Sequence, residues 1–241
     1  MKLIAKTDRG LVRATNQDAY ITGELSDDVV VAVVCDGMGG AKGGNIASSL
    51  AVKLIYEQVS AQFREDMQSK SIKNMLESVI NAANAGVHNI SRSNSELDGM
   101  GTTVVTAIIK RNTAYIAHAG DSRAYMINKN GLTRLTHDHS VVQQLIDSGR
   151  ITQREAMNHP RSNIITRALG VDDYVDIDFS EYSFSKGDCL LICTDGLTNS
   201  LSDEDIAQIA ANTEYYLLAE RLVESAKKQG GRDNITVVTI A

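Results

Sequence analysis

Three aspartates stand at the ends of three apolar runs that lie far apart in the sequence. The run 29–35 stops at Asp36, the run 189–194 stops at Asp195, and Asp233 comes just before the run 235–240. Short runs rich in β-branched residues are typical of strands buried on both faces. If the three strand ends meet, their carboxylates form a site for a hard cation such as Mg²⁺ or Mn²⁺.

A glycine follows two of these aspartates, in Asp36-Gly37 and Asp195-Gly196. Glycine lets the backbone approach a ligand closely, but an Asp-Gly pair between apolar runs is also a common hairpin turn. Taken singly, each pair is better explained as a turn, and we expect Asp98-Gly99 to be one. The prediction of a site therefore depends on the three aspartates together.

Composition limits the class of protein. The chain has 241 residues, of which 43% are hydrophobic and 22% charged, and this is ordinary for one soluble globular domain, which we expect to span residues 1–241. A net charge of −6 without a basic stretch argues against nucleic acid as a partner. The apolar runs fall far short of the roughly 20 residues that span a bilayer, so no membrane partner is expected. Three cysteines inside or beside apolar runs, with no signal-peptide pattern, favour the cytoplasm.

The order of the expected elements predicts the fold class. Helical periodicity is found over 45–59 and 71–91, and short β-branched strands with turn residues between them fill 101–135. Hairpins rather than regular βαβ units favour an antiparallel α+β fold. The segment of about 139–174 interrupts the strands with helical patterns, in which Asp138 is the expected N-cap, and is predicted to be an inserted flap.

Other kinds of binding or catalytic site do not match the spacing of residues in the sequence. The glycines after Asp36 match neither the dinucleotide-binding fingerprint nor the P-loop. Cys35, Cys189 and Cys193 lie in predicted strands, where a thiol is neither accessible nor activated, and they are too few for a structural zinc site. Ligation of a hard cation by aspartate and backbone oxygen remains.

Six motifs, in order along the chain, resemble the metal-dependent (type 2C) serine/threonine protein phosphatases, above all the compact bacterial members. The resemblance extends from residue 13 to residue 236. The motifs are Arg13-x-x-Asn16-Gln17-Asp18, Val34-Cys35-Asp36-Gly37-Met38-Gly39-Gly40, Gly99-Met100-Gly101-Thr102-Thr103, Gly120-Asp121-Ser122-Arg123, Thr194-Asp195-Gly196-Leu197 and Gly231-Arg232-Asp233-Asn234-Ile235-Thr236.

The resemblance implies a fold and a metal centre. The fold would be a four-layer α-β-β-α sandwich with two central antiparallel sheets and a flap. Asp36 would bridge two ions of Mn²⁺ or Mg²⁺, with the Gly37 carbonyl on one ion and Asp195 and Asp233 on the other. Asp18 would act through metal-bound water. A third, weaker ion would be held by Asp121 together with Asp195.

The resemblance also implies a reaction. A metal-bridged hydroxide would hydrolyse phosphoserine and phosphothreonine in proteins, with Arg13 gripping the phosphate through its planar guanidinium. The expected partners are phosphorylated proteins and a cognate serine/threonine kinase, and the expected oligomeric state is a monomer.

One departure leaves the proton donor open. Eukaryotic relatives carry a histidine after the Asp-Gly pair, where this chain has Met38, so His159 and a metal-bound water are the candidates. Two alternative functions also stay open. One is a phosphatase dedicated to a single regulator, like the branch acting on anti-anti-sigma factors. The other is a pseudophosphatase that binds phosphoproteins without turnover.

Overall fold

Two antiparallel sheets form the centre of the structure, a computed structural model that describes residues 1–156 and 159–241. The first sheet has the strand order β1 (Leu3–Asp8), β11 (Ile235–Ile240), β10 (Cys189–Cys193), β7 (Arg123–Asn128) and β8 (Gly131–Arg134). The second has the order β2 (Asp18–Ser26), β3 (Val29–Met38), β5 (Val104–Lys110), β6 (Thr113–Ala119) and β9 (Asp178–Ser183). The two-residue strand β4 (Gly101–Thr102) pairs with the end of β3.

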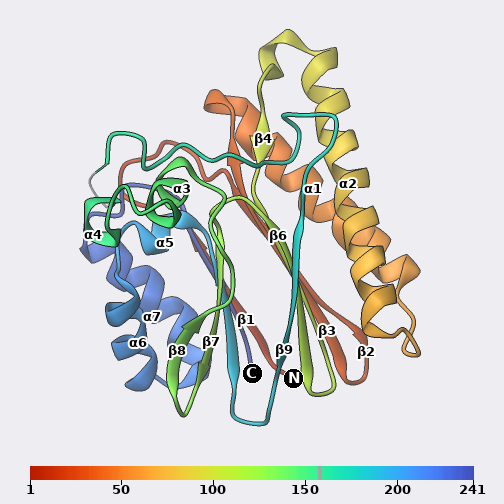
Figure 1. Ribbon diagram of the computed structural model, residues 1–241, viewed down its shortest axis with the longest axis vertical. Helices are drawn as coiled ribbons and strands as arrows, with labels where there is room; N and C mark the ends of the chain where they lie inside the picture. The colour runs from red at the N-terminus through yellow and green to blue at the C-terminus, as the bar shows by residue number, and fades with distance from the viewer. Residues whose placement is uncertain (157–158) are drawn as a thin grey trace.

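Helices cover the outer face of each sheet. Helices α1 (Gly40–Gln62) and α2 (Ser69–Ser93) pack on the second sheet, and a short 3₁₀ turn, η1 (Ser95–Leu97), follows them. Helices α5 (Asp195–Thr198), α6 (Asp203–Ala211) and α7 (Tyr215–Lys228) pack on the first sheet. Figure 1 shows the two helical layers on opposite sides of the sheets. The predicted four-layer arrangement is confirmed.

The apolar strand runs are explained by burial on both faces. In β3, Val29, Val31 and Val33 face α1 and α2, whereas Val30 and Val34 face the other sheet. In β10 and β11 the side chains alternate in the same way. One set packs between the two sheets, and the other packs under α6 and α7. Each strand therefore contributes to two hydrophobic clusters, which fixes its register, because a slip of one residue would exchange them.

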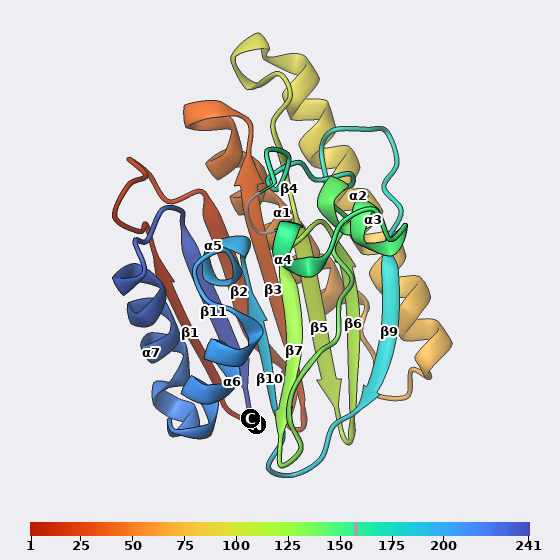
Figure 2. The ribbon, with the colours of Figure 1, turned by 60° about the vertical axis from the view of Figure 1, so that its left-hand side comes forward.

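The same end of the sandwich carries β4, α5 and the segment with α3 (Val141–Asp147) and α4 (Gln153–Ala156), as Figure 2 shows. This segment connects β8 to β9 and corresponds to the predicted flap. The predicted N-cap of α3 is wrong. Ser140 caps the helix, with its hydroxyl accepting from the Gln143 N–H at 3.2 Å, because Asp138 is buried in ion pairs with Arg123 and Arg134.

No helix in the ranges 1–156 and 159–241 combines the length and the apolar character that a membrane span requires.

Asn84 fastens the return limb of the flap to helix α2. Its side chain is fully buried, accepts from the Gly170 N–H at 2.7 Å and donates to the carbonyls of Asp172 and Asp173 at 2.9 and 3.2 Å. These bonds satisfy backbone groups just beyond the isolated β-bridge that Leu169 forms with Thr102. A buried backbone group without a partner is costly.

We expect Asn84→Ala to lower the free energy of unfolding by at least about 2 kcal/mol, because it leaves buried backbone groups unpaired. Denaturant unfolding followed by circular dichroism measures this loss. Asn74→Ala, on the exposed side of the same helix, is the control and should cause no loss. Equal stability of the two variants would contradict this role for Asn84.

Candidate metal centre

Strand pairing places two of the predicted aspartates side by side. Asp18 at the start of β2 and Asp36 near the end of β3 are direct antiparallel partners. The Asp36 backbone is fixed on its other side by Thr103, whose hydroxyl accepts from the Asp36 N–H at 3.0 Å and whose N–H donates to the Asp36 carbonyl at 2.9 Å. The carboxylate of Asp36 therefore leaves the sheet in a fixed direction.

The first sheet brings Asp195 and Asp233 to the same place. Asp195 begins α5 directly after β10, and Asp233 lies just before β11, the neighbouring strand. Two threonines join the sheets, since the hydroxyls of Thr194 and Thr236 both donate to Oδ2 of Asp18, at 2.9 and 2.7 Å. Both threonines belong to the six motifs, but the sequence assigned them no role, because only the packing of the two sheets brings them to Asp18.

Gly37 requires glycine for reasons of space. A Cβ on Gly37 would lie 2.0 Å from the carbonyl oxygen of Gly44, and a Cβ on Gly44 would lie 2.6 Å from the Gly37 carbonyl oxygen. Helix α1 thus approaches the Asp36-Gly37 strand end more closely than any side chain would allow. Gly44 was missed from the sequence, although a glycine in a predicted helix start is a signal of close packing.

Asp121 joins the other carboxylates from a turn between β6 and β7. The turn begins at Gly120, whose φ of +112° suits glycine. Its following residue, Ser122, shares a 2.7 Å hydrogen bond with Thr103. The Asp36 strand end and the Asp121 turn are therefore held by the same threonine.

Burial and mutual repulsion raise the pKa of the clustered carboxyl groups. Burial raises the pKa of Asp18 to about 7, against its two threonine hydrogen bonds. Burial and the charges of Asp18, Asp195 and Asp121 hold the pKa of Asp36 well above its usual range. The pKa values of Asp121 and Asp195 are raised by burial and by their acidic neighbours. A cluster of this kind is relieved by bound cations.

Arg13 lies against one of the predicted ligands. Its Nη2 is 2.6 Å from Oδ2 of Asp233, and this ion pair raises the pKa of Arg13. From the sequence, Arg13 is predicted to bind the substrate phosphate and Asp233 to bind a metal ion. The contact shows that these two groups are immediate neighbours. The side chain of Arg13 is half exposed and lines the cleft.

Asn234 builds the loop that carries Arg13. Its amide nitrogen donates to the carbonyls of Arg9 and Thr15, both at 2.9 Å, and its Oδ1 accepts from the Gln17 N–H at 2.8 Å. The buried Asn234 follows Asp233 in the chain. The position of the Arg13 loop is therefore set by the same segment that presents Asp233.

The carboxylates line one cleft of about 540 Å³, and its other wall comes from the flap. Its lining includes Arg13, Asp36, Gly37, Met38, Asp121, Asn163, Ile165, Asp195 and Asp233. Asp18 lies beneath them, 8% exposed. The structure thus brings together every residue predicted for the site.

The histidines divide differently. Among the described residues, no histidine lines this cleft, His159 included. His137 pairs with Asp147, whereas His139 is buried. His118 is buried in β6.

The donor set fits hard divalent cations. Carboxylate and carbonyl oxygens are the ligands that Mg²⁺ and Mn²⁺ prefer. Within the described part of the chain, the buried Oδ1 of Asp18 has no hydrogen-bond partner, although its Oδ2 has two. An oxygen of this kind needs a water or an ion above it. Asp36, Asp195, Asp233 and the Gly37 carbonyl are the groups that would hold two cations.

The raised pKa of Asp18 predicts an unusual pH dependence for the metal-free protein. The carboxyl has a pKa of about 7 when folded and 3.8 when unfolded, so the folded state binds the extra proton between these values. Its contribution to stability is therefore present at low pH and lost as pH rises through about 7.

In excess EDTA, we expect the melting temperature of the wild type to fall between about pH 5 and pH 8 relative to that of Asp18→Asn. Asparagine keeps an oxygen for the two threonines but cannot ionise. Differential scanning calorimetry across this range measures the difference. Parallel curves for the two proteins would show that Asp18 does not titrate in this window.

Comparisons with known proteins agree with this geometry. The family model described as protein phosphatase 2C matches residues 12–231. The chain is 37% identical, over 98% of its length and 93% of the relative's, to the serine/threonine phosphatase stp of Listeria monocytogenes. The crystal structure of the serine/threonine phosphatase Stp1 from Staphylococcus aureus superposes with a TM-score of 0.94 at 32% identity, covering 100% of this chain and 94% of that one.

A third relative carries metal. The catalytic domain of the serine/threonine protein phosphatase PstP, crystallised in complex with two manganese ions, matches with a TM-score of 0.84 and 33% identity over 99% of this chain and 96% of that chain. The matched family model spans nearly the whole sequence, and the fold of the metal-bound relative is the fold described above. The chain therefore belongs to the protein phosphatase 2C family of metal-dependent serine/threonine phosphatases.

Proposed function

We propose that this phosphatase, one domain over residues 1–241, hydrolyses phosphoserine and phosphothreonine in proteins at two cations of Mn²⁺ or Mg²⁺. Asp36, the Gly37 carbonyl, Asp195 and Asp233 would hold these two cations, with Asp36 shared between them, Gly37 on one and Asp195 and Asp233 on the other. Asp18 would act through water, and Asp121 with Asp195 would hold a third, weaker cation. When bound, two such cations lower the pKa of water and neutralise phosphoryl oxygens.

The observation that carries the proposal is the convergence of five aspartates from both sheets at one cleft. The raised pKa values of four of them, Asp18, Asp36, Asp121 and Asp195, reflect charge gathered without enough compensation from the chain. A structural cluster would be expected to pair such groups with arginine or lysine. Here the one cation of the described chain in contact with the ligand set is the half-exposed Arg13, beside Asp233.

Arg13 has the chemistry to orient the phosphate. A guanidinium offers several donors in a plane that matches phosphate oxygens. Its contact with Asp233 directs it toward the metal ligands, so the phosphate it holds is presented to that side of the cleft. The flap residues Asn163 and Ile165 form the facing wall.

The biological setting follows from the reaction. A phosphatase of this class opposes a serine/threonine kinase and acts on phosphorylated proteins, and we place it in the cytoplasm as a monomer. The net charge of −6 gives no general attraction for anionic substrates, so the cleft cations and Arg13 must provide it.

We expect Asp36→Asn to abolish the release of phosphate from p-nitrophenyl phosphate and from a phosphothreonine peptide. The wild type should turn over both substrates with Mn²⁺ and lose activity in excess EDTA. Asp36 interacts with Asp18, Asp195 and Asp121, so its neutralisation removes the bridging charge. The assay measures inorganic phosphate with time.

The matched control is Asp28→Asn, in the turn at the opposite end of the β2–β3 hairpin, which should retain wild-type activity. A folded wild type that binds a phosphothreonine peptide without hydrolysing it would favour a pseudophosphatase. Turnover of one regulator's phosphoprotein, with none of generic phosphopeptides or p-nitrophenyl phosphate, would favour a phosphatase dedicated to that regulator.

We expect Arg13→Ala to weaken the binding of phosphate groups about tenfold or more, because it removes charge-assisted hydrogen bonds. The KM for the phosphothreonine peptide and the Ki for inorganic phosphate should both rise. Affinity for Mn²⁺ should stay equal or increase, since Asp233 loses a competing cation. Arg92→Ala on the surface of α2 is the control. A lower Mn²⁺ affinity with an unchanged phosphate Ki would contradict this role.

A further inference from the structure

His139 holds both polar backbone groups of Gly120, the residue before Asp121. The Gly120 N–H donates to Nδ1 of the His139 ring at 3.1 Å, and the His139 N–H donates to the Gly120 carbonyl at 2.9 Å. Gly120 has its φ at +112°, and a Cβ there would lie 2.6 Å from Thr103. The turn that presents Asp121 is therefore packed against Thr103 and hydrogen-bonded to His139.

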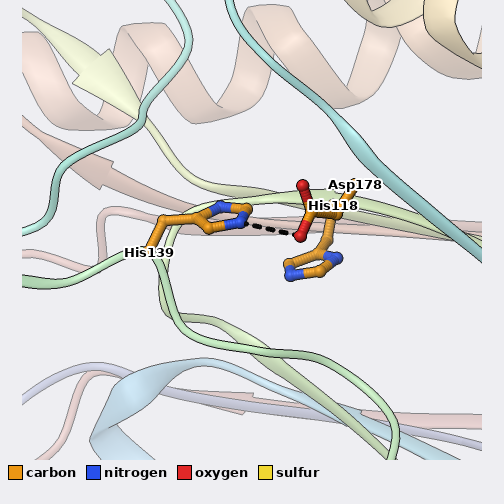
Figure 3. A group of neighbouring side chains, drawn as sticks. All are labelled: His118, His139 and Asp178. Carbon is orange, nitrogen blue, oxygen red and sulfur yellow. Dashed lines mark ion pairs between the residues drawn. The ribbon is translucent and has the colours of Figure 1, made fainter. Parts of the chain in front are cut away.

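The ring of His139 is itself fixed by three neighbours. Because Nδ1 accepts from Gly120, the neutral ring carries its proton on Nε2, which lies 3.2 Å from Oδ2 of Asp178 at the start of β9 (Figure 3). The ring stacks on His118, with centroids 4.8 Å apart and planes 6° apart. Arg167 contacts the other oxygen of Asp178 at 2.7 Å. Burial lowers the pKa of His139 to about 4, in keeping with a neutral ring.

The group His118, His139 and Asp178 has the composition of a transition-metal site, with ligand atoms within 4.8 Å of one another. Its geometry argues against one. Lone pairs of imidazole lie in the ring plane, and two stacked, nearly parallel rings cannot both direct them at one ion. Nδ1 of His139 already accepts a hydrogen bond from Gly120. Nη1 of Arg167 lies 3.0 Å from Nε2 of His139, so the positive charge of Arg167 stands where a metal ion would have to bind.

His139 also joins the metal centre to the return limb of the flap. Its carbonyl accepts from the Thr166 N–H at 2.8 Å, and Arg167 is the next residue. In the same limb, Asn163 and Ile165 line the metal cleft. One residue, His139, therefore connects this limb to the turn that carries Asp121.

We propose that His139 is a positioning residue for Asp121, linking the flap to the weaker metal position through Gly120. This inference rests on the proposed role of Asp121 in holding a third cation. Residues that orient metal ligands through hydrogen bonds typically affect metal affinity by about 10- to 100-fold. Loss of the Gly120 bond should therefore weaken the third cation and leave the two held by Asp36, Asp195 and Asp233 unchanged.

Two substitutions of His139 test the contacts of its two ring nitrogens separately. In His139→Asn, the amide oxygen can take the place of Nδ1 and accept from Gly120. In His139→Gln, the longer side chain can reach Asp178 but leaves Gly120 unpaired. The measurement is a Mn²⁺ titration followed by electron paramagnetic resonance, which counts bound ions and gives their Kd values, with Asp121→Asn and His137→Asn as references.

We expect the wild type, His139→Asn and His137→Asn to bind three ions alike. Asp121→Asn should lose the weakest ion, and His139→Gln should bind it about tenfold or more weakly. The Gly120 amide should be protected from hydrogen exchange in His139→Asn and exchange faster in His139→Gln, whether or not Mn²⁺ is present. If His139→Gln does not fold, Asp178→Ala at the exposed Asp178 provides a second test, because it removes the acceptor that orients Nε2 and so loosens the ring from Gly120, with an expected loss of affinity for the weakest ion only.

Two negative outcomes are distinguishable. A third ion that Asp121→Asn removes but that both His139→Gln and Asp178→Ala leave unchanged would overturn the role of His139 alone. A wild type that binds two ions, with Asp121→Asn identical to it, would overturn the assignment of Asp121 and this inference with it, while the two-ion centre would stand.

Discussion

Repulsion among five aspartates at one end of the sandwich is the constraint on which the rest of the structure depends. Each comes from a different strand or turn, so no local rearrangement separates them. Burial and the neighbouring charges hold the pKa of Asp36 well above its usual range. A protein keeps such an arrangement only when something outside the chain compensates the charge, and divalent cations do so for carboxylate clusters.

The scaffold holds the carboxylates against this repulsion mainly with hydroxyl and backbone groups, and the charge of Arg123 only partly offsets the raised pKa values of Asp121 and Asp195. Thr194 and Thr236 join the first sheet to Asp18 of the second, and Thr103 fixes both the Asp36 strand end and the Asp121 turn. Neutral donors of this kind fix direction without competing with a cation for the charge. Arg13 is the exception, and its position at the rim of the ligand set suits a group that must meet the phosphate.

Much of the fold and the site could be predicted from the sequence, because both leave local signals. Runs such as 29–35 with an acid at one end identify buried strands and their exposed ends, and short connections imply antiparallel pairing. The contacts that cross between distant segments leave no such signal. The Arg13–Asp233 pair joins residues 220 positions apart, and the threonines reach Asp18 only when the sheets pack. Asp138 was a plausible N-cap by type, but two arginines brought by β7 and β8 bury it instead.

The most direct test of the central claim is a crystal structure of the protein grown with Mn²⁺, in which anomalous scattering locates the ions. The account predicts two strong peaks at the cleft that share Asp36 as a ligand, one in contact with the Gly37 carbonyl and the other with Asp195 and Asp233. Arg13 should then have released Asp233. A protein saturated with Mn²⁺ that shows no peak within bonding distance of Asp36 would contradict the account.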